Sequence, residues 1–105
     1  MPRIIRRDRA LDDLAEHWSY RALELGPDSA DALIDRIEKR LQLLAQYPES
    51  GTKRDELRPG LRSVVLGKLV LFYHPLRDGI ELVRVLDGRR DLRPLLNEED
   101  EDDES

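Results

Sequence analysis

Residues 61–86 read LRSVVLGKLVLFYHPLRDGIELVRVL, and this stretch decides the fold. It contains three runs rich in Val, Leu and Ile, at residues 61–66, 69–74 and 80–86. Turn residues separate the runs, Gly67-Lys68 in the first gap and residues 76–79 in the second. Short β-type runs joined by turn residues predict an antiparallel meander. The middle run is apolar on both faces, so we expect it to be the central strand.

Two amphipathic helices are predicted upstream of the meander. In residues 9–25 and 29–46 the apolar side chains recur in steps of three and four, which places them on one stripe of each helix. The stripes consist of Leu11, Leu14, Ala15, Trp18, Ala22 and Leu25, and of Leu33, Ile34, Ile37, Leu41, Leu44 and Ala45. Asp8 and Asp28 stand where N-caps are expected, while Gly26-Pro27 and Pro48 end the helices. The pair should form an antiparallel hairpin whose stripes, Trp18 included, cover one face of the sheet.

The remaining segments complete a single domain over residues 1–97. A short strand around Ile4 and Ile5 is expected at residues 3–6, a loop at 47–60 and a short helix at 91–96. The predicted fold class is therefore α+β, a helical hairpin packed on a small antiparallel sheet. Its order is β-α-α-β-β-β with a short C-terminal helix.

The net charge of −5 is concentrated at the end of the chain. Seven of the 23 acidic residues form the run 98–104, so residues 1–97 carry 16 acidic and 18 basic side chains. Such a run repels itself, and residues 98–105 are predicted to be disordered. It is either a solubilising end or a segment that folds back over the basic half and competes with an acidic or anionic partner.

The composition excludes several classes of chemistry. The chain has no Cys, which rules out disulfides and thiolate nucleophiles. The two histidines, His17 and His74, do not form a ligand cluster, and no phosphate-binding glycine loop is present. We therefore expect no metal site and no cofactor. No apolar run approaches the roughly 20 residues of a membrane helix, so no membrane contact and a cytoplasmic location are expected.

Arginine dominates the second half of the chain. Residues 51–97 carry 10 basic and 6 acidic side chains, and Arg favours planar carboxylate or phosphate partners. We interpret the cluster as a binding surface for an acidic protein segment or for RNA; the alternative is a solvated surface paired to Asp55, Glu56, Asp87 and Asp91. Phe72 and Tyr73 must face opposite sides of the sheet, and Tyr73 is the only aromatic available to a partner. The predicted binding residues are Arg54, Arg58, Arg62, Tyr73, Arg84, Asp87, Arg89, Arg90 and Asp91.

Three stretches resemble the ParE-type toxins of the ParE/RelE superfamily. The long segment 32–75 contains YPESG, ELRPGLRS and LFYHP, the segment 79–92 reads GIELVRVLDGRRDL, and RRDRALDDLAEHWSYRA at 6–22 is similar to the family's first helix. The resemblance implies a toxin that is neutralised by a ParD-like antitoxin. It also implies inhibition of DNA gyrase by binding, without a cofactor and without enzymatic activity.

The other arm of the superfamily, the RelE type, cleaves messenger RNA on the ribosome. In its pattern an Arg stands where this chain has Val70, and a Tyr stands where this chain has Leu96. A second Arg of the pattern is matched by Arg90. A nuclease would have to use Arg90, Arg62 and His74, and only in that alternative is direct nucleic-acid binding expected. The His that is frequent in the ParE ending is Asp87 here, which would pair with Arg89 or Arg62. A third alternative is a toxin-fold protein that binds antitoxin but has lost toxicity.

Overall fold

The computed structural model describes residues 1–90, 93, 94 and 96. Within the helix expected at 91–96, the described residues Arg93, Pro94 and Leu96 are helical. Asp91 and the acidic run 98–104 lie outside the described residues. In the part of the chain that is described, no helix combines the length and apolar character needed to cross a bilayer.

The order of elements agrees with the predicted α+β fold. The elements are β1 (Arg3–Arg6), α1 (Asp8–Leu25), α2 (Pro27–Gln46), β2 (Thr52–Lys53), β3 (Arg62–Leu66), β4 (Leu69–Leu76) and β5 (Gly79–Asp87). They form one sheet in the order β1-β5-β4-β3-β2, with β4 in the middle as expected. Two features differ from the expectation. The sheet is mixed, because β1 runs parallel to β5, and the two-residue β2 lies within the predicted loop.

The helix starts lie one or two residues earlier than predicted. Arg7 and Gly26 are the N-caps, and neither helix has a side-chain cap hydrogen bond. The expectation that Asp8 and Asp28 act as caps is therefore wrong. Both lie in the first helical turn, where a carboxylate is stabilised by the helix dipole instead. Pro27 is tolerated at the start of α2 because the first turn needs no N–H donor from it.

Both faces of the sheet are covered. The face under the hairpin packs Leu71, Tyr73 and Leu82 against α2, with the cluster completed by Ala10, Leu33, Ile37, Leu41, Leu44, Ala45, Leu66, Leu69, Ile80 and Val85. The opposite face holds a second cluster of Leu61, Val70, Phe72, Val83, Leu86 and Leu96, with Leu57 packed against it. The segment between β2 and β3 and the chain after β5 therefore close that side.

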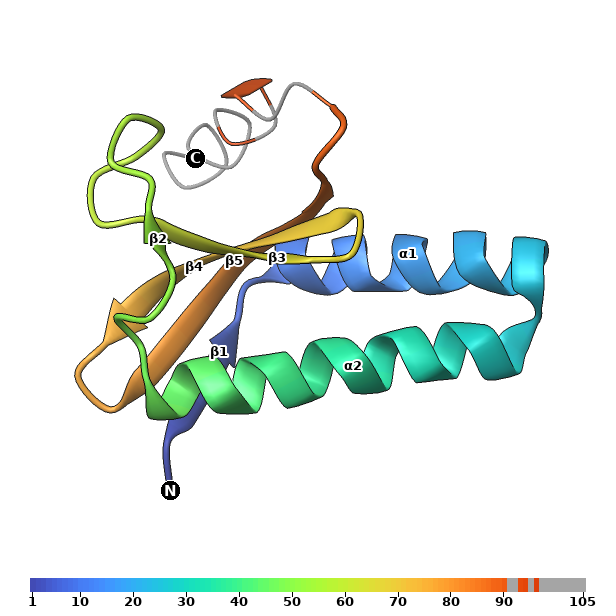
Figure 1. The fold of residues 1–105 in the computed structure, drawn as a ribbon, viewed down its shortest axis with the longest axis horizontal. Coiled ribbons are helices and arrows are strands. Elements are labelled where there is room, and N and C mark those ends of the chain that lie inside the picture. Colours follow the sequence, from blue (N-terminus) through green and yellow to red (C-terminus); the bar gives the residue numbers. More distant parts are fainter. Residues whose placement is uncertain (91–92, 95, 97–105) are drawn as a thin grey trace.

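The hairpin is longer than the sheet that it covers. The connecting end of α1 and α2 projects past the strands (Figure 1), because α1 has 18 residues and spans about 27 Å. Only Ala10 and Asp13 of α1 are buried, so the predicted burial of its stripe is wrong for Leu11, Trp18 and Leu25, which are exposed. The indole N–H of Trp18 donates to Asp31 Oδ1 of α2 at 2.8 Å instead.

Gly79 allows β1 to pair closely with β5. It lies directly opposite Arg3, and a Cβ at this position would come within 2.7 Å of both the backbone nitrogen and the carbonyl carbon of Arg3. We expect Gly79→Ala to lower the free energy of unfolding by about 1–3 kcal/mol, the cost of overpacking against atoms that cannot yield. Urea denaturation followed by circular dichroism measures the loss. Gly26→Ala has open space around its Cβ but a φ of +91°, so it carries backbone strain without a steric clash and separates these two causes.

Candidate functional site

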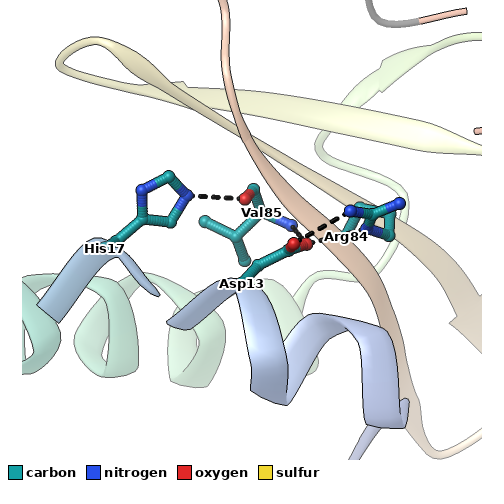
Figure 2. Close-up of polar contacts among 4 residues, drawn as sticks. All are labelled: Asp13, His17, Arg84 and Val85. Atoms are coloured by element: carbon teal, nitrogen blue, oxygen red, sulfur yellow. Dashed lines mark hydrogen bonds and ion pairs between the residues drawn. The ribbon is translucent and has the colours of Figure 1, made fainter. Parts of the chain in front are cut away.

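Side chains of α1 take the place of a strand along part of the β5 edge. β1 pairs only with residues 79–82 of β5, which leaves the following residues without a neighbouring strand on that side. The N–H of Val85 donates to Asp13 Oδ2 at 2.9 Å, and His17 Nε2 lies 2.7 Å from the Val85 carbonyl oxygen. Since a carbonyl only accepts, His17 is the donor. Asp13 and His17, one helical turn apart, thus satisfy both backbone groups of Val85 (Figure 2).

A buried ion pair ties the same turn of α1 to β5. Arg84 Nε and Nη2 donate to the two carboxylate oxygens of Asp13 at 2.8 and 2.9 Å, and each residue is only 6% exposed. Arg84 was predicted to bind a partner, and the structure contradicts this because its guanidinium is engaged inside the fold. Asp13 was not among the predicted functional residues, since in sequence it cannot be told from its exposed neighbour Asp12.

A β-bulge precedes this ion pair. The register pairs Phe72 with Arg84 and Tyr73 with Leu82, so Val83 is an extra residue in β5. Bulges bend a strand and change the direction of its side chains. The bulge at Val83 therefore lies between the residues of β5 that pair with β1 and the residues that contact α1.

The chain after β5 begins with a turn that presents two arginines. Asp87 Oδ1 accepts the Arg89 N–H at 2.9 Å, and the Asp87 carboxylate accepts Arg89 Nε at 3.0 Å and Nη2 at 2.7 Å. Arg89 was one of the two partners predicted for Asp87. The Arg89 side chain is still 68% exposed, and Arg90 is exposed and has no ion pair with a described residue. The hydrogen bonds from Arg89 lower the pKa of Asp87 well below its usual range.

The lowered pKa gives a prediction for the Asp87–Arg89 contact. A depressed carboxyl pKa means that the contact is present above the ordinary Asp value of about 3.9 and is lost only as the pH falls through the lower native value. We expect the Asp87 carboxyl resonance to remain that of the ionised form at pH 3.5. In Arg89→Ala its midpoint should rise toward about 3.9, whereas Arg90→Ala should leave it unchanged. An NMR titration in which both variants behave alike would contradict the assignment.

Three further predicted binding residues hold the segment between α2 and β3. Arg62 Nη1 donates to the carbonyls of Glu49 at 2.9 Å and Gly51 at 2.8 Å. Arg54 donates to Glu56 and Ser63 and lies 5.6 Å from the centre of the Phe72 ring. Arg58 donates to the Leu96 carbonyl at 2.9 Å. These three side chains donate their hydrogen bonds within the fold. Of the six arginines predicted to form a binding surface, Arg89 and Arg90 therefore remain available to a partner.

Tyr73 is also part of the fold. It is fully buried under the hairpin, where its hydroxyl donates to the Pro48 carbonyl at 2.8 Å and accepts the Gly51 N–H at 2.9 Å. Burial raises the pKa of the Tyr73 phenol. The expectation that Tyr73 faces a partner is wrong, because Tyr73 lies on the hairpin side of β4. The opposite side, which carries Phe72, is also covered, by Arg54 and the second cluster.

The structure does not assemble the nuclease residues Arg62, His74 and Arg90. Arg62 pairs with Tyr73 across the sheet, so His74, the next residue, faces the other side. Leu69 pairs with Asp87, which places Arg90 beyond that end of β4. The five residue steps from Leu69 to His74 span about 16 Å. Burial also lowers the pKa of His74, which keeps its ring neutral at pH 7. The described residues contain no group of three or more His, Asp or Glu side chains able to hold a metal ion.

Comparisons with known proteins agree on the family. Residues 4–92 match the family described as the ParE toxin of the type II toxin–antitoxin system parDE. The chain is 31% identical over 96 residues to Toxin ParE3 of Caulobacter vibrioides, covering 91% of this chain and 96% of that protein. It is 34% identical over 80 residues to Toxin ParE1 of Mycobacterium tuberculosis, covering 75% and 82% respectively.

A solved structure supports the fold. The protein described as the chromosomal ParDE TA system from P. aeruginosa superposes with a TM-score of 0.71 at 20% sequence identity, over 83% of this chain and 96% of that one. At this identity the likeness concerns the fold alone. The family match and the curated relatives carry the assignment: the chain belongs to the ParE toxin family of type II toxin–antitoxin systems.

Proposed function

We propose that the chain inhibits DNA gyrase in the bacterial cytoplasm and is neutralised by a ParD-like antitoxin. The observation that carries the proposal is the family match over residues 4–92, which includes both hairpin helices, all of the sheet except Arg3, and the turn after β5. An inhibitor of this kind needs only a rigid, charged contact surface and no reacting group. That requirement fits a chain whose predicted nuclease residues lie apart.

The target contact is assigned to the turn after β5. Asp87 holds Arg89 by a backbone and two side-chain hydrogen bonds, so one guanidinium is presented in a restricted geometry. Arg90 follows on the exposed side of the same turn. Restricted guanidinium groups form strong charge-assisted hydrogen bonds with carboxylates. Asp91, predicted from the sequence for the same contact, remains a candidate outside the described residues.

A supercoiling assay with purified gyrase tests the proposal directly. The chain should inhibit ATP-dependent supercoiling, and Arg89→Ala/Arg90→Ala should require about tenfold more protein or higher for the same inhibition, the effect of two lost charge contacts. Lys39→Ala/Lys53→Ala, which removes two exposed cations elsewhere, is the matched control. Both variants should unfold at the temperature of the unmodified chain, because none of the four side chains is buried.

Induction of the chain alone in a bacterial host separates the alternatives. Gyrase inhibition predicts filamentation and a DNA-damage response with intact messenger RNA. Rapid cleavage of ribosome-bound messages would reject the proposal in favour of a nuclease. Normal growth together with no effect in the supercoiling assay would reject it in favour of a protein that only binds an antitoxin.

A further inference from the structure

Three exposed cations lie together at one end of the sheet. Lys68 is in the turn between β3 and β4, and Arg89 and Arg90 are in the turn after β5. The two turns are adjacent, because the Gly88 N–H donates to the Lys68 carbonyl at 2.8 Å. The side chains of Lys68 and Arg90 have no hydrogen bond or ion pair with any residue that the structure describes. We call Lys68, Arg89 and Arg90 the cationic end of the sheet.

The carboxylates near the cationic end do not cancel its charge. The charged side chains around the hollow beside Lys68 and Arg89 are four cations and two carboxylates: Arg21, Arg36, Lys68, Arg89, Glu24 and Asp87. Glu24 keeps its charge, whereas the Asp87 carboxylate is already engaged by Arg89. Around Arg90 the exposed and half-exposed charges are balanced, with Arg9 and Arg90 facing Asp12 and Glu16. An excess of positive charge therefore remains beside Lys68 and Arg89, where it attracts anions.

The acidic run 98–104 begins close to a fixed point of the fold. Leu96 is only 2% exposed within the second cluster, and its carbonyl accepts a hydrogen bond from Arg58 Nη2 at 2.9 Å. At about 3.4 Å per residue, an extended run would reach from about 7 to about 27 Å beyond Leu96. Arg90 is six residues before Leu96, so the two lie at most about 20 Å apart. The run is therefore long enough to reach the cationic end.

We infer that the acidic run 98–104 lies on the cationic end of its own chain and shields it from other anionic partners. Its seven carboxylates complement the guanidinium groups of Arg89 and Arg90, with which carboxylates form charge-assisted hydrogen bonds. The segment between β2 and β3 offers fewer donors, because Arg54 and Arg58 already donate to Glu56 and to the Leu96 carbonyl.

The covalent connection makes this contact favourable although each ion pair is weak. Surface ion pairs contribute little one by one. Within one chain, however, the effective concentration of the run at the cationic end is on the order of millimolar. The contact itself does not depend on the proposed function. Its consequence, competition between the run and gyrase for Arg89 and Arg90, rests on the proposed function.

A spin label at the end of the full chain tests where the run lies. The sequence has no Cys, so Ser105→Cys provides the only thiol for a nitroxide. At low salt, the backbone amide signals of the cationic end should lose most of their intensity relative to the reduced label, and they should lose more than those of Lys53 and Arg77. About 1 M NaCl, which shortens the screening length to about 3 Å, should restore the signals.

A variant of equal length separates charge from mere proximity. This neutralised variant carries Gln for each Glu and Asn for each Asp in residues 98–104, and in it the label should leave the cationic end unaffected. In fluorescence anisotropy the neutralised variant should bind a synthetic oligoglutamate peptide about tenfold more tightly than the unmodified chain does. Adding Lys68→Ala/Arg89→Ala/Arg90→Ala to both chains should reduce this gain to less than about twofold. The matched control Lys39→Ala/Lys53→Ala/Arg77→Ala should preserve it.

Four outcomes overturn the inference. Full signal intensity at the cationic end would leave the run a solubilising segment without a contact. Signal loss that persists in the neutralised variant would come from the covalent connection alone. Greater signal loss at Lys53 would place the run near β2. An equal gain in peptide affinity in both triple variants would reflect net charge alone.

None of these outcomes depends on gyrase, so the supercoiling assay judges the proposed function separately. If both proposals hold, the neutralised variant should inhibit supercoiling at a lower concentration than the unmodified chain. If the label confirms the contact but the neutralised variant inhibits no better, the contact stands and the turn after β5 is not the target surface.

Discussion

Asp13→Ala is expected to lower the free energy of unfolding by about 3–5 kcal/mol. The substitution leaves the Arg84 guanidinium, only 6% exposed, without the carboxylate that now accepts two of its hydrogen bonds. It also removes the acceptor of the Val85 N–H. Removing one partner of a buried pair costs far more than the pair contributes, because the remaining charge stays desolvated after its carboxylate is lost. Urea denaturation monitored by circular dichroism measures the loss.

Two variants control for other causes of this loss. Asp12→Ala removes an exposed carboxylate at the next position of α1 and should change stability by less than about 0.5 kcal/mol. Asp13→Leu/Arg84→Met removes both charges and fills their volume, so it should recover most of the stability that Asp13→Ala loses. If Asp13→Ala and Asp12→Ala were equally stable, the ion pair would contribute nothing to holding α1 on β5.

The helices and the meander were predictable because their signals are local. Apolar spacing of three and four residues marked α1 and α2, and the change to short Val- and Leu-rich runs marked β3, β4 and β5. The parallel pairing of β1 with β5 has no local signal, since it joins residues about 76 positions apart in the register of Arg3 and Gly79. The exposure of most of the α1 stripe could not be predicted for a similar reason. Burial of the stripe depends on how far the sheet extends, and the sequence of α1 carries no information on that length.

The site was predictable only at the end of β5. The Asp87–Arg89 pair spans two residues, so the sequence could indicate it. Asp13 and Arg84 are 71 residues apart, and nothing in the sequence distinguishes Arg84 from the exposed Arg89. Arginine count therefore overestimated the binding surface, because a chain with a small apolar core uses Arg54, Arg58 and Arg62 to fasten its loops.

Tyr73→Ala is the second variant with a large expected effect, a loss of about 3–5 kcal/mol in the free energy of unfolding. The ring is fully buried among α2 and sheet residues, so its removal leaves a cavity. The hydroxyl also bridges Pro48 and Gly51, and thereby fastens the end of α2 to the sheet. Gly51 has to be a glycine for this bridge, since a Cβ there would come within 2.8 Å of Tyr73 Cε1.

Tyr73→Phe separates the cavity from the bridge and tests the role first predicted for this residue. Keeping the ring but leaving the Gly51 N–H without an acceptor should cost about 1–3 kcal/mol. Hydrogen exchange should then accelerate at Gly51 more than at Leu71, which lies in the same strand as Tyr73. A partner-contact role requires the opposite pattern, full stability with weakened binding of the antitoxin or gyrase. An exposed phenol has no buried hydrogen bond to lose. Thermal unfolding of Tyr73→Phe therefore decides whether Tyr73 stabilises the fold or contacts a partner.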